Sequence, residues 1–348
     1  MISALVAWAE LPAQPTYTPH EIGTLGGNYS EATGINNAGQ IIGRSLRADG
    51  RTHAFLQTGA VMTDLGTLPG DVGSDAIAIN SRGDVVGTSR SSRGIDRGFL
   101  YRNGTMTEIV ATPPAYSMLP RDINDAGQVV GLWRRATEPD FTRPFVYVDG
   151  RFTDLGELGG MTRTAAEGIN NAGVIIGGND RTDLGGFIAQ PDGTVANLGA
   201  VGGRPAYPFA IADNGLVLVT TTTFGSDLQM HRYEGGRTSP YGRPGTDALA
   251  IMPKAMNNAG QVVGYTRAGF GQPQAVLFTE ADPINLNTRI PAGSFGRLTD
   301  ANGINDSGAI VGRFERADSS PRGFLLVPPA AGAPTIRVAP ASQSVPTG

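Results

Sequence analysis

The chain has 348 residues, among them 50 glycines, 24 prolines and no cysteine, and its formal net charge is −4. Without cysteine there is no disulfide framework, no thiol catalysis and no cysteine-ligated zinc. The chain lacks the basic charge of proteins that bind nucleic acid or anionic lipid, and no apolar run reaches the ~20 residues of a membrane helix. These observations exclude a nucleic-acid partner and membrane insertion, whereas a hydrophobic content of 40% is enough for a folded core.

The first fifteen residues differ in character from the rest of the chain. The apolar run Ile2–Ala9 ends in Ala7-Trp8-Ala9, an A-x-A-like site, but no basic segment precedes it. The pattern is similar to the second half of a secretory signal peptide. We therefore interpret residues 1–15 as a signal-peptide remnant or, alternatively, as an N-terminal arm packed on the domain.

Residues 16–328 are predicted to form one repeat domain. A nine-residue phrase, in which an aliphatic residue and Asn are followed by two turn residues, Gly, any residue, two aliphatic residues and Gly, first occurs at Ile35–Gly43. It returns roughly every 45 residues, a period typical of propeller arrays. The seven anchor positions of this phrase are Asn36, Asn80, Asn124, Asn170, Ala212 in a degenerate copy, Asn257 and Asn305.

Each repeat contains four short extended segments separated by turn residues. In the first repeat they span residues 30–35, 40–46, 52–57 and 61–65. A Phe that opens a short apolar run in the third segment and an Asp-Leu-Gly phrase in the fourth return in later repeats. Consecutive aliphatic residues such as Ile41 and Ile42 are typical of strands covered on both faces. Four strands in such a repeat indicate a propeller blade. The sequence thus predicts an all-β, seven-bladed β-propeller with four-stranded blades, whose inner strands lie at 30–35, 74–79, 118–123, 164–169, 206–211, 251–256 and 299–304.

The two ends of the array are complementary. The last repeat supplies only three strands and ends near Phe324–Val327, whereas the segment Thr16–Ile22 precedes the first repeat and runs into the Gly-Thr-Leu-Gly-Gly phrase. We expect residues 18–22 to pair antiparallel with the strand of Phe324 as the outer strand of the last blade, because this closure removes an open sheet edge.

The last twenty residues are predicted to lie outside the propeller. The segment Pro328–Pro334 is typical of a linker, and Thr335–Val345 resembles the first strand of a bacterial Ig-like domain. We expect residues 329–348 to be a linker and a truncated Ig-like strand.

The three phrases together resemble the bacterial extracellular HAF-repeat family. The residues that carry the resemblance are Gly23–Gly27, Gly34–Gly43 and His53-Ala54-Phe55-Leu56, with their later copies, over about residues 20–327. The resemblance implies a secreted or surface-located repeat protein. It implies no reaction and no catalytic residues.

The repeated Asn residues and the three histidines point to architecture. An Asn side chain bonds its own backbone two residues on, and the Gly that follows tolerates a positive φ angle, so the anchors predict tight turns. The histidines, His20, His53 and His231, lie in different repeats and lack the spacing of zinc ligands. We therefore expect no metal and no cofactor.

Polar residues that break the repeat pattern near the axis are the candidate ligand-binding residues. Arg121, Glu167 and Lys254 lie three residues before their anchors, and Tyr207 lies five before its own. They are expected either to form an internal ion-pair set that fills the channel or to bind a polar ligand at its mouth. Two segments predicted as long loops, 133–143 and 178–186, add further candidates: Trp133, Arg134, Arg135, Asp180 and Arg181.

The sequence favours a secreted or cell-surface, non-catalytic binding or display module for a glycan or protein ligand, monomeric within a larger polypeptide. The alternative is a propeller enzyme, a lyase or glycoside hydrolase, on an extracellular polysaccharide. In that case Arg121, Glu167, Tyr207 and Lys254 supply charge neutralisation and acid–base groups. Enzymatic activity is left open, with no catalytic residues assigned.

Overall fold

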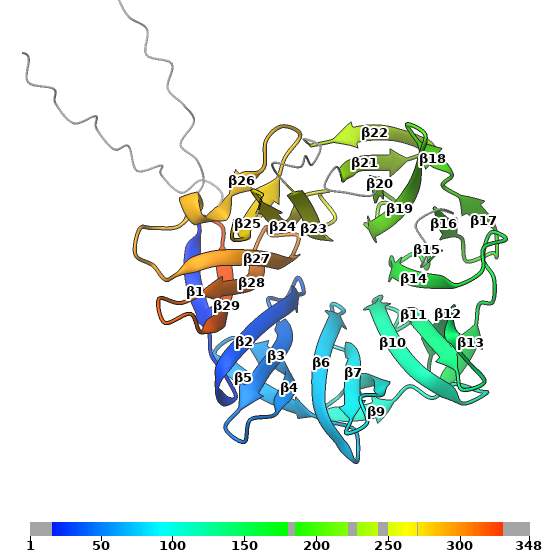
Figure 1. Cartoon of the computed structure of the whole chain (residues 1–348), viewed down its shortest axis with the longest axis horizontal. Coiled ribbons are helices and arrows are strands. Elements are labelled where there is room, and N and C mark those ends of the chain that lie inside the picture. Colours follow the sequence, from blue (N-terminus) through cyan, green and yellow to red (C-terminus); the bar gives the residue numbers. More distant parts are fainter. Residues whose placement is uncertain (1–15, 180–184, 222–227, 243–249, 270, 330–348) are drawn as a thin grey trace, which may run out of the picture.

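The computed structural model describes residues 16–179, 185–221, 228–242, 250–269 and 271–329. Seven antiparallel sheets surround a central axis, as a seven-bladed β-propeller (Figure 1). Within the described residues the helical content is one 3₁₀ turn, η1 (Leu286–Arg289). No described segment is a helix that could span a membrane. The predicted fold is confirmed, while the expectations for residues 1–15 and 330–348 lie outside the described residues.

The blades are numbered in chain order, and each begins with its inner strand. The strands of blades 1 to 3 are β2 (Gly26–Ile35), β3 (Ile41–Arg47), β4 (Thr52–Thr58) and β5 (Val61–Gly66); β6 (Asp71–Ile79), β7 (Val85–Ser91), β8 (Asp96–Arg102) and β9 (Thr105–Glu108); β10 (Ala115–Ile123), β11 (Val129–Arg135), β12 (Glu138–Val148) and β13 (Arg151–Asp154).

Blades 4 to 7 repeat this order. Their strands are β14 (Thr164–Ile169), β15 (Ile175–Asn179), β16 (Gly186–Ala189) and β17 (Val195–Asn197); β19 (Arg204–Ile211), β20 (Val217–Thr221), β21 (Gln229–Glu234) and β22 (Arg237–Tyr241), with the short β18 (Ala200–Val201) added beside β19; β23 (Ala250–Met256), β24 (Val262–Arg267), β25 (Gln274–Phe278) and β26 (Ile284–Asn285); β27 (Arg297–Ile304), β28 (Ile310–Glu315), β29 (Pro321–Val327) and β1 (Thr18–Ile22). All seven predicted inner strands lie within observed ones.

A Gly in the second strand of a blade and a Phe in the third explain two of the repeated phrases. Gly43 is the direct partner of Phe55, and a Cβ atom on Gly43 would lie 2.0 Å from the Glu31 carbonyl and 2.8 Å from the Phe55 ring. The Phe ring therefore covers the glycine, and both are completely packed: Phe55 has 0% of its surface exposed. Blade 5 has other residues at both positions, since Val219 lies opposite His231 there.

The anchor Asn residues form the predicted turns and also join neighbouring blades. Asn36 Oδ1 accepts hydrogen bonds from the backbone N–H groups of Ala38 and Gln40, at 3.1 and 2.9 Å. Its Nδ2 donates to the carbonyl of Asn80, the next anchor, at 3.0 Å. The same donation links all six Asn anchors to the following blade, and the last one returns from Asn305 to Asn36. Ala212 cannot donate, so this anchor ring is broken between blades 5 and 6.

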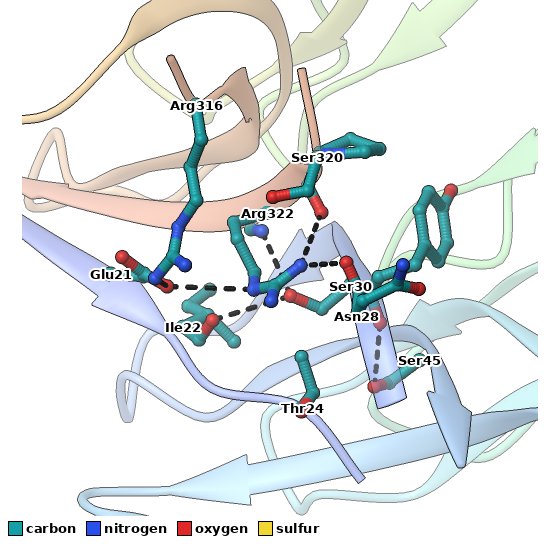
Figure 2. Close-up of polar contacts among 12 residues, drawn as sticks. Glu21, Ile22, Thr24, Asn28, Ser30, Ser45, Arg316, Ser320 and Arg322 are labelled. Carbon is teal, nitrogen blue, oxygen red and sulfur yellow. Dashed lines mark hydrogen bonds and ion pairs between the residues drawn. The ribbon is translucent and has the colours of Figure 1, made fainter. Parts of the chain in front are cut away.

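The ring closes at blade 7 as the sequence predicts. Strand β1 lies antiparallel to β29, with Thr18 opposite Val327 and Ile22 opposite Gly323. Figure 2 shows that Ser30 of blade 1 holds both strands: its Oγ donates to the Ile22 carbonyl at 3.3 Å and accepts from the Gly323 N–H at 3.0 Å. The first blade thus fixes the strand pair that closes the last one.

An ion-pair cluster covers this closure. Figure 2 places the Glu21 carboxylate of β1 between the guanidinium groups of Arg316 and Arg322. Arg322 has 12% of its side chain exposed and also donates to the Asn28 carbonyl of blade 1. Glu21 lies at the position that Asp64 has in blade 1. There, Asp64 Oδ1 is 2.8 Å from Nδ1 of His53. The His and Asp of the repeated phrases therefore serve as partners on adjacent strands.

Candidate functional site

One position in each blade determines the surface of the channel at the end away from the Asn turns. There a residue of the inner strand lies directly opposite a residue of the second strand, and we call these two residues the rim pair of the blade. In blades 1 to 7 the rim pairs are Glu31 and Arg44, Asp75 and Thr88, Leu119 and Leu132, Ala165 and Gly178, Tyr207 and Thr220, Met252 and Tyr265, and Asp300 and Arg313. The backbone register is constant, so the side chains alone make the blades differ.

The rim pairs of blades 7, 1 and 2 form a connected set of charges. Arg44 donates from Nε and Nη2 to one Glu31 oxygen, at 3.0 and 2.7 Å, and lies 3.6 Å from Asp75. In blade 7, Arg313 binds Asp300 at 2.8 Å. Burial alone would raise the pKa of Glu31, but the hydrogen bond from Tyr29 and the guanidinium of Arg44 outweigh it and hold that pKa below its usual value. The Glu31 carboxylate is therefore held in its ionised, paired form.

Blade 4 has no bulky side chain in its rim pair, and a cavity of about 390 Å³ lies there. Ala165 and Gly178 form part of its wall, Leu132 of blade 3 lies on one side and Tyr207 of blade 5 on the other. Arg121, Arg134 and Glu167 add the charged groups of the lining. The cavity is thus enclosed by three consecutive blades, and three of the four predicted site residues line it.

Arg121 and Glu167 form a loose ion pair in this cavity. Their closest atoms, Nε and Oε2, are 3.6 Å apart, and each side chain has 41% of its surface exposed. The surrounding channel wall still desolvates the carboxylate, so burial raises the pKa of Glu167, and the Arg121 guanidinium lowers it in part. The pair is accessible to a ligand, and the Glu167 carboxylate is weakly stabilised compared with Glu31.

Lys254, the fourth predicted residue, lies outside this cavity. It is exposed on β23 of blade 6, and its Nζ is 5.7 Å from the centre of the Tyr265 ring, within the range of a cation–π contact. The structure brings Arg121, Glu167 and Tyr207 to one cavity but separates Lys254 from them.

The proposed role of Trp133 as an exposed loop anchor is wrong. Strands β11 and β12 extend through most of the segment 133–143, which is a hairpin and not a long loop. Trp133 has 0% of its surface exposed and packs edge-on against Phe152, with ring centres 5.0 Å apart. Arg135 binds Asp154 at 3.0 Å on the same blade. Of these candidates only Arg134 lines the cavity, and Asp180 and Arg181 lie outside the described residues.

Sequence reasoning missed a half-buried carboxylate, Asp122. It lies two residues before the anchor Asn124, where the other blades have Gly or Ala, and this contrast was the available signal. Its carboxylate accepts from the N–H groups of Ile123 at 2.8 Å and of Ile169 at 2.9 Å, and it therefore joins blades 3 and 4. Burial raises its pKa to about 6, although these two hydrogen bonds oppose the shift.

The opposite end of the channel carries amides and carboxylates that bind one another. A hollow of about 260 Å³ lies there. The residue after each anchor lines it, and Asn171, for example, donates from Nδ2 to Asp125 and to Asp213, each at 3.0 Å. In the described part of the chain no cluster of three or more His, Cys, Asp or Glu residues could hold a metal ion. These contacts extend the blade-to-blade ring and leave little binding capacity.

A larger hollow, about 700 Å³, lies on blade 7 beside the β28–β29 hairpin. Phe295 and Phe314 stack at its base, with ring centres 4.4 Å apart. Two ion pairs border it, Arg297 with Glu315 and Arg316 with Glu21. Because these charges neutralise each other, the hollow is larger than the cavity of blades 3 to 5 but is less suited to bind a polar ligand.

No protein-family model matches the sequence, and no similar sequence was found among curated proteins. Solved structures do resemble the fold. YCF48 bound to D1 peptide aligns with a TM-score of 0.55 at 10% identity, over 93% of this chain and 99% of that chain. An oligogalacturonate lyase from Vibrio parahaemolyticus aligns with a TM-score of 0.54 at 11% identity, over 90% and 97%.

A puromycin-hydrolyzing peptidase of Mycobacterium tuberculosis has a TM-score of 0.56 at 14% identity. The alignment covers 92% of this chain and 56% of the peptidase chain, so the likeness is to part of that larger protein. At such identities a shared propeller carries no shared chemistry. The chain is similar to peptide-binding and catalytic proteins in its fold alone, and that fold is a seven-bladed β-propeller.

Proposed function

We propose that this protein is a secreted or cell-surface, non-catalytic propeller that binds a glycan or protein ligand in the cavity of blades 3 to 5. The single observation that carries the proposal is the rim pair of blade 4: Ala165 and Gly178 leave open the place that ion pairs fill in blades 1 and 7. Propellers commonly bind ligands at the mouth of the central channel, where loops and inner strands meet.

Two further features support this function. Arg121, Glu167 and Tyr207 offer a cation, an anion and an aromatic ring around one cavity, which is the mixture of apolar surface and few polar groups that ligand sites present. The resemblance to the HAF-repeat family and the signal-like residues 1–15 support a secreted or surface location, with the Ig-like C-terminal segment as an attachment to a larger polypeptide.

Filling the cavity tests the proposal. A glycan array and a peptide array first identify a ligand of the folded protein. Leu at position 165 reproduces the aliphatic side chain that blade 3 has at Leu119, so Ala165→Leu should fold and should weaken binding at least tenfold by excluding the ligand. Ala165→Ser keeps the volume and should bind like the parent. A protein whose ligand affinity is equal in all three forms, or which binds nothing on either array, contradicts the proposal.

One observation favours a catalytic alternative, a lyase or glycoside hydrolase on an extracellular polysaccharide. The raised pKa of Glu167 beside a cation is a property that acid–base catalysts share. Reducing-end and unsaturated-product assays on a panel of polysaccharides test it. A turnover that is lost in Glu167→Gln would favour the enzyme, and the absence of any product would leave the binding module.

A further inference from the structure

Arg121 lies between two hollows. It lines the cavity of blades 3 to 5, and it also lines a second hollow of about 340 Å³ over blades 1 to 3. The second hollow contains Thr33, Thr88 and Asp75 together with Arg90. The two hollows therefore meet at one guanidinium group, and a ligand with several units can occupy both only by passing this group.

The cavity of blades 3 to 5 has an excess of positive charge. Arg121 and Arg134 face one carboxylate, Glu167. The Arg121 contact to it is a single one at 3.6 Å, whereas Arg44 donates twice to Glu31. The side chain of Arg134 is half-buried and forms no ion pair or hydrogen bond with any residue that the structure describes. Since a guanidinium group binds a carboxylate through charge-assisted bonds, these two arginines favour an anionic group in the ligand.

The lining favours a sugar over a peptide. The Thr88 hydroxyl lines this hollow beside three groups that internal contacts hold in place: Thr33 donates to the Ala76 carbonyl at 2.9 Å, Asp75 lies 3.6 Å from Arg44, and Arg90 binds Asp96 at 2.8 Å. The remaining lone pairs and N–H groups of this set are the closely spaced donors and acceptors that a polyhydroxylated ligand requires. In the first cavity the apolar surface consists of the Leu132 side chain, the Tyr207 ring and the small faces of Ala165 and Pro208. A deep apolar pocket for the large side chain that usually anchors a peptide is missing from this lining.

We propose that the ligand is an acidic glycan, with a uronate carboxylate bound at Arg121 and Arg134 and the adjoining sugar unit in the hollow over blades 1 to 3. This inference rests on the proposed binding function and names its ligand class. The carboxylate would compete with Glu167 for Arg121, and the Tyr207 ring would contact the apolar face of a sugar ring in the cavity of blades 3 to 5.

Isothermal titration of the full chain with two acidic oligosaccharides tests the proposal. The probes are short oligogalacturonates and oligomannuronates, each compared with its carboxyl-reduced, neutral counterpart and with a glutamate-rich peptide. We expect one acidic series to bind at least tenfold more tightly than its neutral form and than the peptide. If both acidic series fail to bind, if the neutral forms bind equally well, or if the peptide binds more tightly, the proposal is overturned.

Charge variants then locate the site. Arg121→Gln and Arg134→Gln should each weaken binding of the acidic oligosaccharide roughly tenfold or more. Glu167→Gln removes the competing carboxylate and should tighten it several-fold, an opposite effect that simple misfolding would not produce. Arg237→Gln changes an exposed arginine on β22 and should leave the affinity unaltered. Equal affinities in all four variants would overturn the assignment.

The two proposals can fail separately. If Ala165→Leu abolishes binding of an array ligand while Arg121→Gln and Glu167→Gln leave it unchanged, the cavity is the binding site and the acidic-glycan assignment is wrong. If neither the cavity variant nor the charge variants alter binding, the proposed function itself is contradicted.

Discussion

The two halves of the channel mouth have the same backbone and opposite chemistry. Blades 7, 1 and 2 place acids against arginines, and Glu31, Arg44 and Asp75 are connected by ion pairs. Blades 3 to 6 place aliphatic, small or aromatic residues at the same register positions, and their charges form one ion pair in the cavity, a loose one at 3.6 Å. The charges of the first half neutralise one another, whereas the second half offers an incompletely paired cation to a charged ligand.

The difference shows how a repeat protein separates stability from binding. The Asn anchors recur in six blades and the Gly–Phe contacts in five, and they hold the fold, so the rim pairs are free to vary. A blade can carry an ion pair, an aliphatic pair or an empty position there without a change of strand register. The cavity therefore arises from the size of two side chains in blade 4 and not from an irregular backbone.

Removing the closing strand β1 should have the largest effect on stability, because blade 7 of the charged half is then left with an open sheet edge. Deletion of residues 1–22 exposes the edge of β29 and removes buried Tyr17 and Ile22. We expect the melting temperature to fall by roughly ten degrees or more. Deletion of residues 330–348, which the sequence predicts to lie outside the propeller, should change it little. Two truncations with equal melting temperatures would contradict the closed ring.

Truncation of arginines should distinguish the halves directly. Arg44→Ala leaves Glu31 without its cation in a partly buried network and should lower the free energy of unfolding by about 1–2 kcal/mol. Arg121→Ala removes one loose, accessible contact and should cost less than about 0.5 kcal/mol. Chemical denaturation of the two variants measures this difference. Equal losses would show that the halves do not differ in stability.

An Asn at the degenerate anchor, Ala212, should stabilise the half formed by blades 3 to 6. Ala212→Asn supplies the Nδ2 group that the other six anchors use to bind the next blade, here the carbonyl of Asn257. We expect a gain of about 1 kcal/mol in the free energy of unfolding. Asn80→Ala, which breaks an intact link, should cost a similar amount. A destabilised Ala212→Asn variant would show that blades 5 and 6 cannot form this bond.

The pH dependence of two carboxylates should have opposite signs. The lowered pKa of Glu31 contributes stability above its unfolded value, which is lost as the pH falls through the folded pKa. The pKa of Glu167 is raised, so its ionisation disfavours the folded state, and this cost disappears as the pH falls through the raised value.

Glu167→Gln should therefore be slightly more stable than the parent at neutral pH and equal to it below about pH 4. Glu31→Gln should be less stable at neutral pH, and its deficit should close over the acid range. Thermal melts from pH 7 to pH 3.5 compare the two variants. The same sign for both would refute the contrast drawn between the halves.

The fold could be predicted from the sequence because the turn residues and the number of repeats both indicate a closed seven-bladed ring. Each Asn-x-x-Gly phrase specifies a turn, and a last blade with three strands required a fourth from the other end, which Thr18–Ile22 supplies. The blade-to-blade donation of the anchors was not predicted. A single repeat specifies the turn of Asn36, but only the ring places the Asn80 carbonyl within its reach.

The candidate site could be predicted in part. Arg121, Glu167 and Tyr207 meet because blades 3 to 5 are consecutive. Lys254 lies apart because it belongs to blade 6, where it is beside the Tyr265 ring. The cavity itself was not predicted, because the pattern of the inner strands alone does not show which residue of the second strand lies opposite Ala165. The column eight residues after each anchor holds Gly178, and pairing it with Ala165 would have indicated the open position. Trp133 was misplaced because strand extension cannot be inferred from a segment of mixed polar residues.

The antiparallel pairing of Thr18 with Val327 has a mechanical consequence. Both flanks of the propeller leave from the same point, at the face of the Asn turns and opposite the cavity. Any polypeptide joined there presents the cavity away from its attachment. A pulling force on the two flanks would load the β1–β29 hydrogen bonds one after another, as in a zipper, and not all together in shear. Under tension the ring should therefore open at blade 7 first, before the cavity between blades 3 and 5 is distorted.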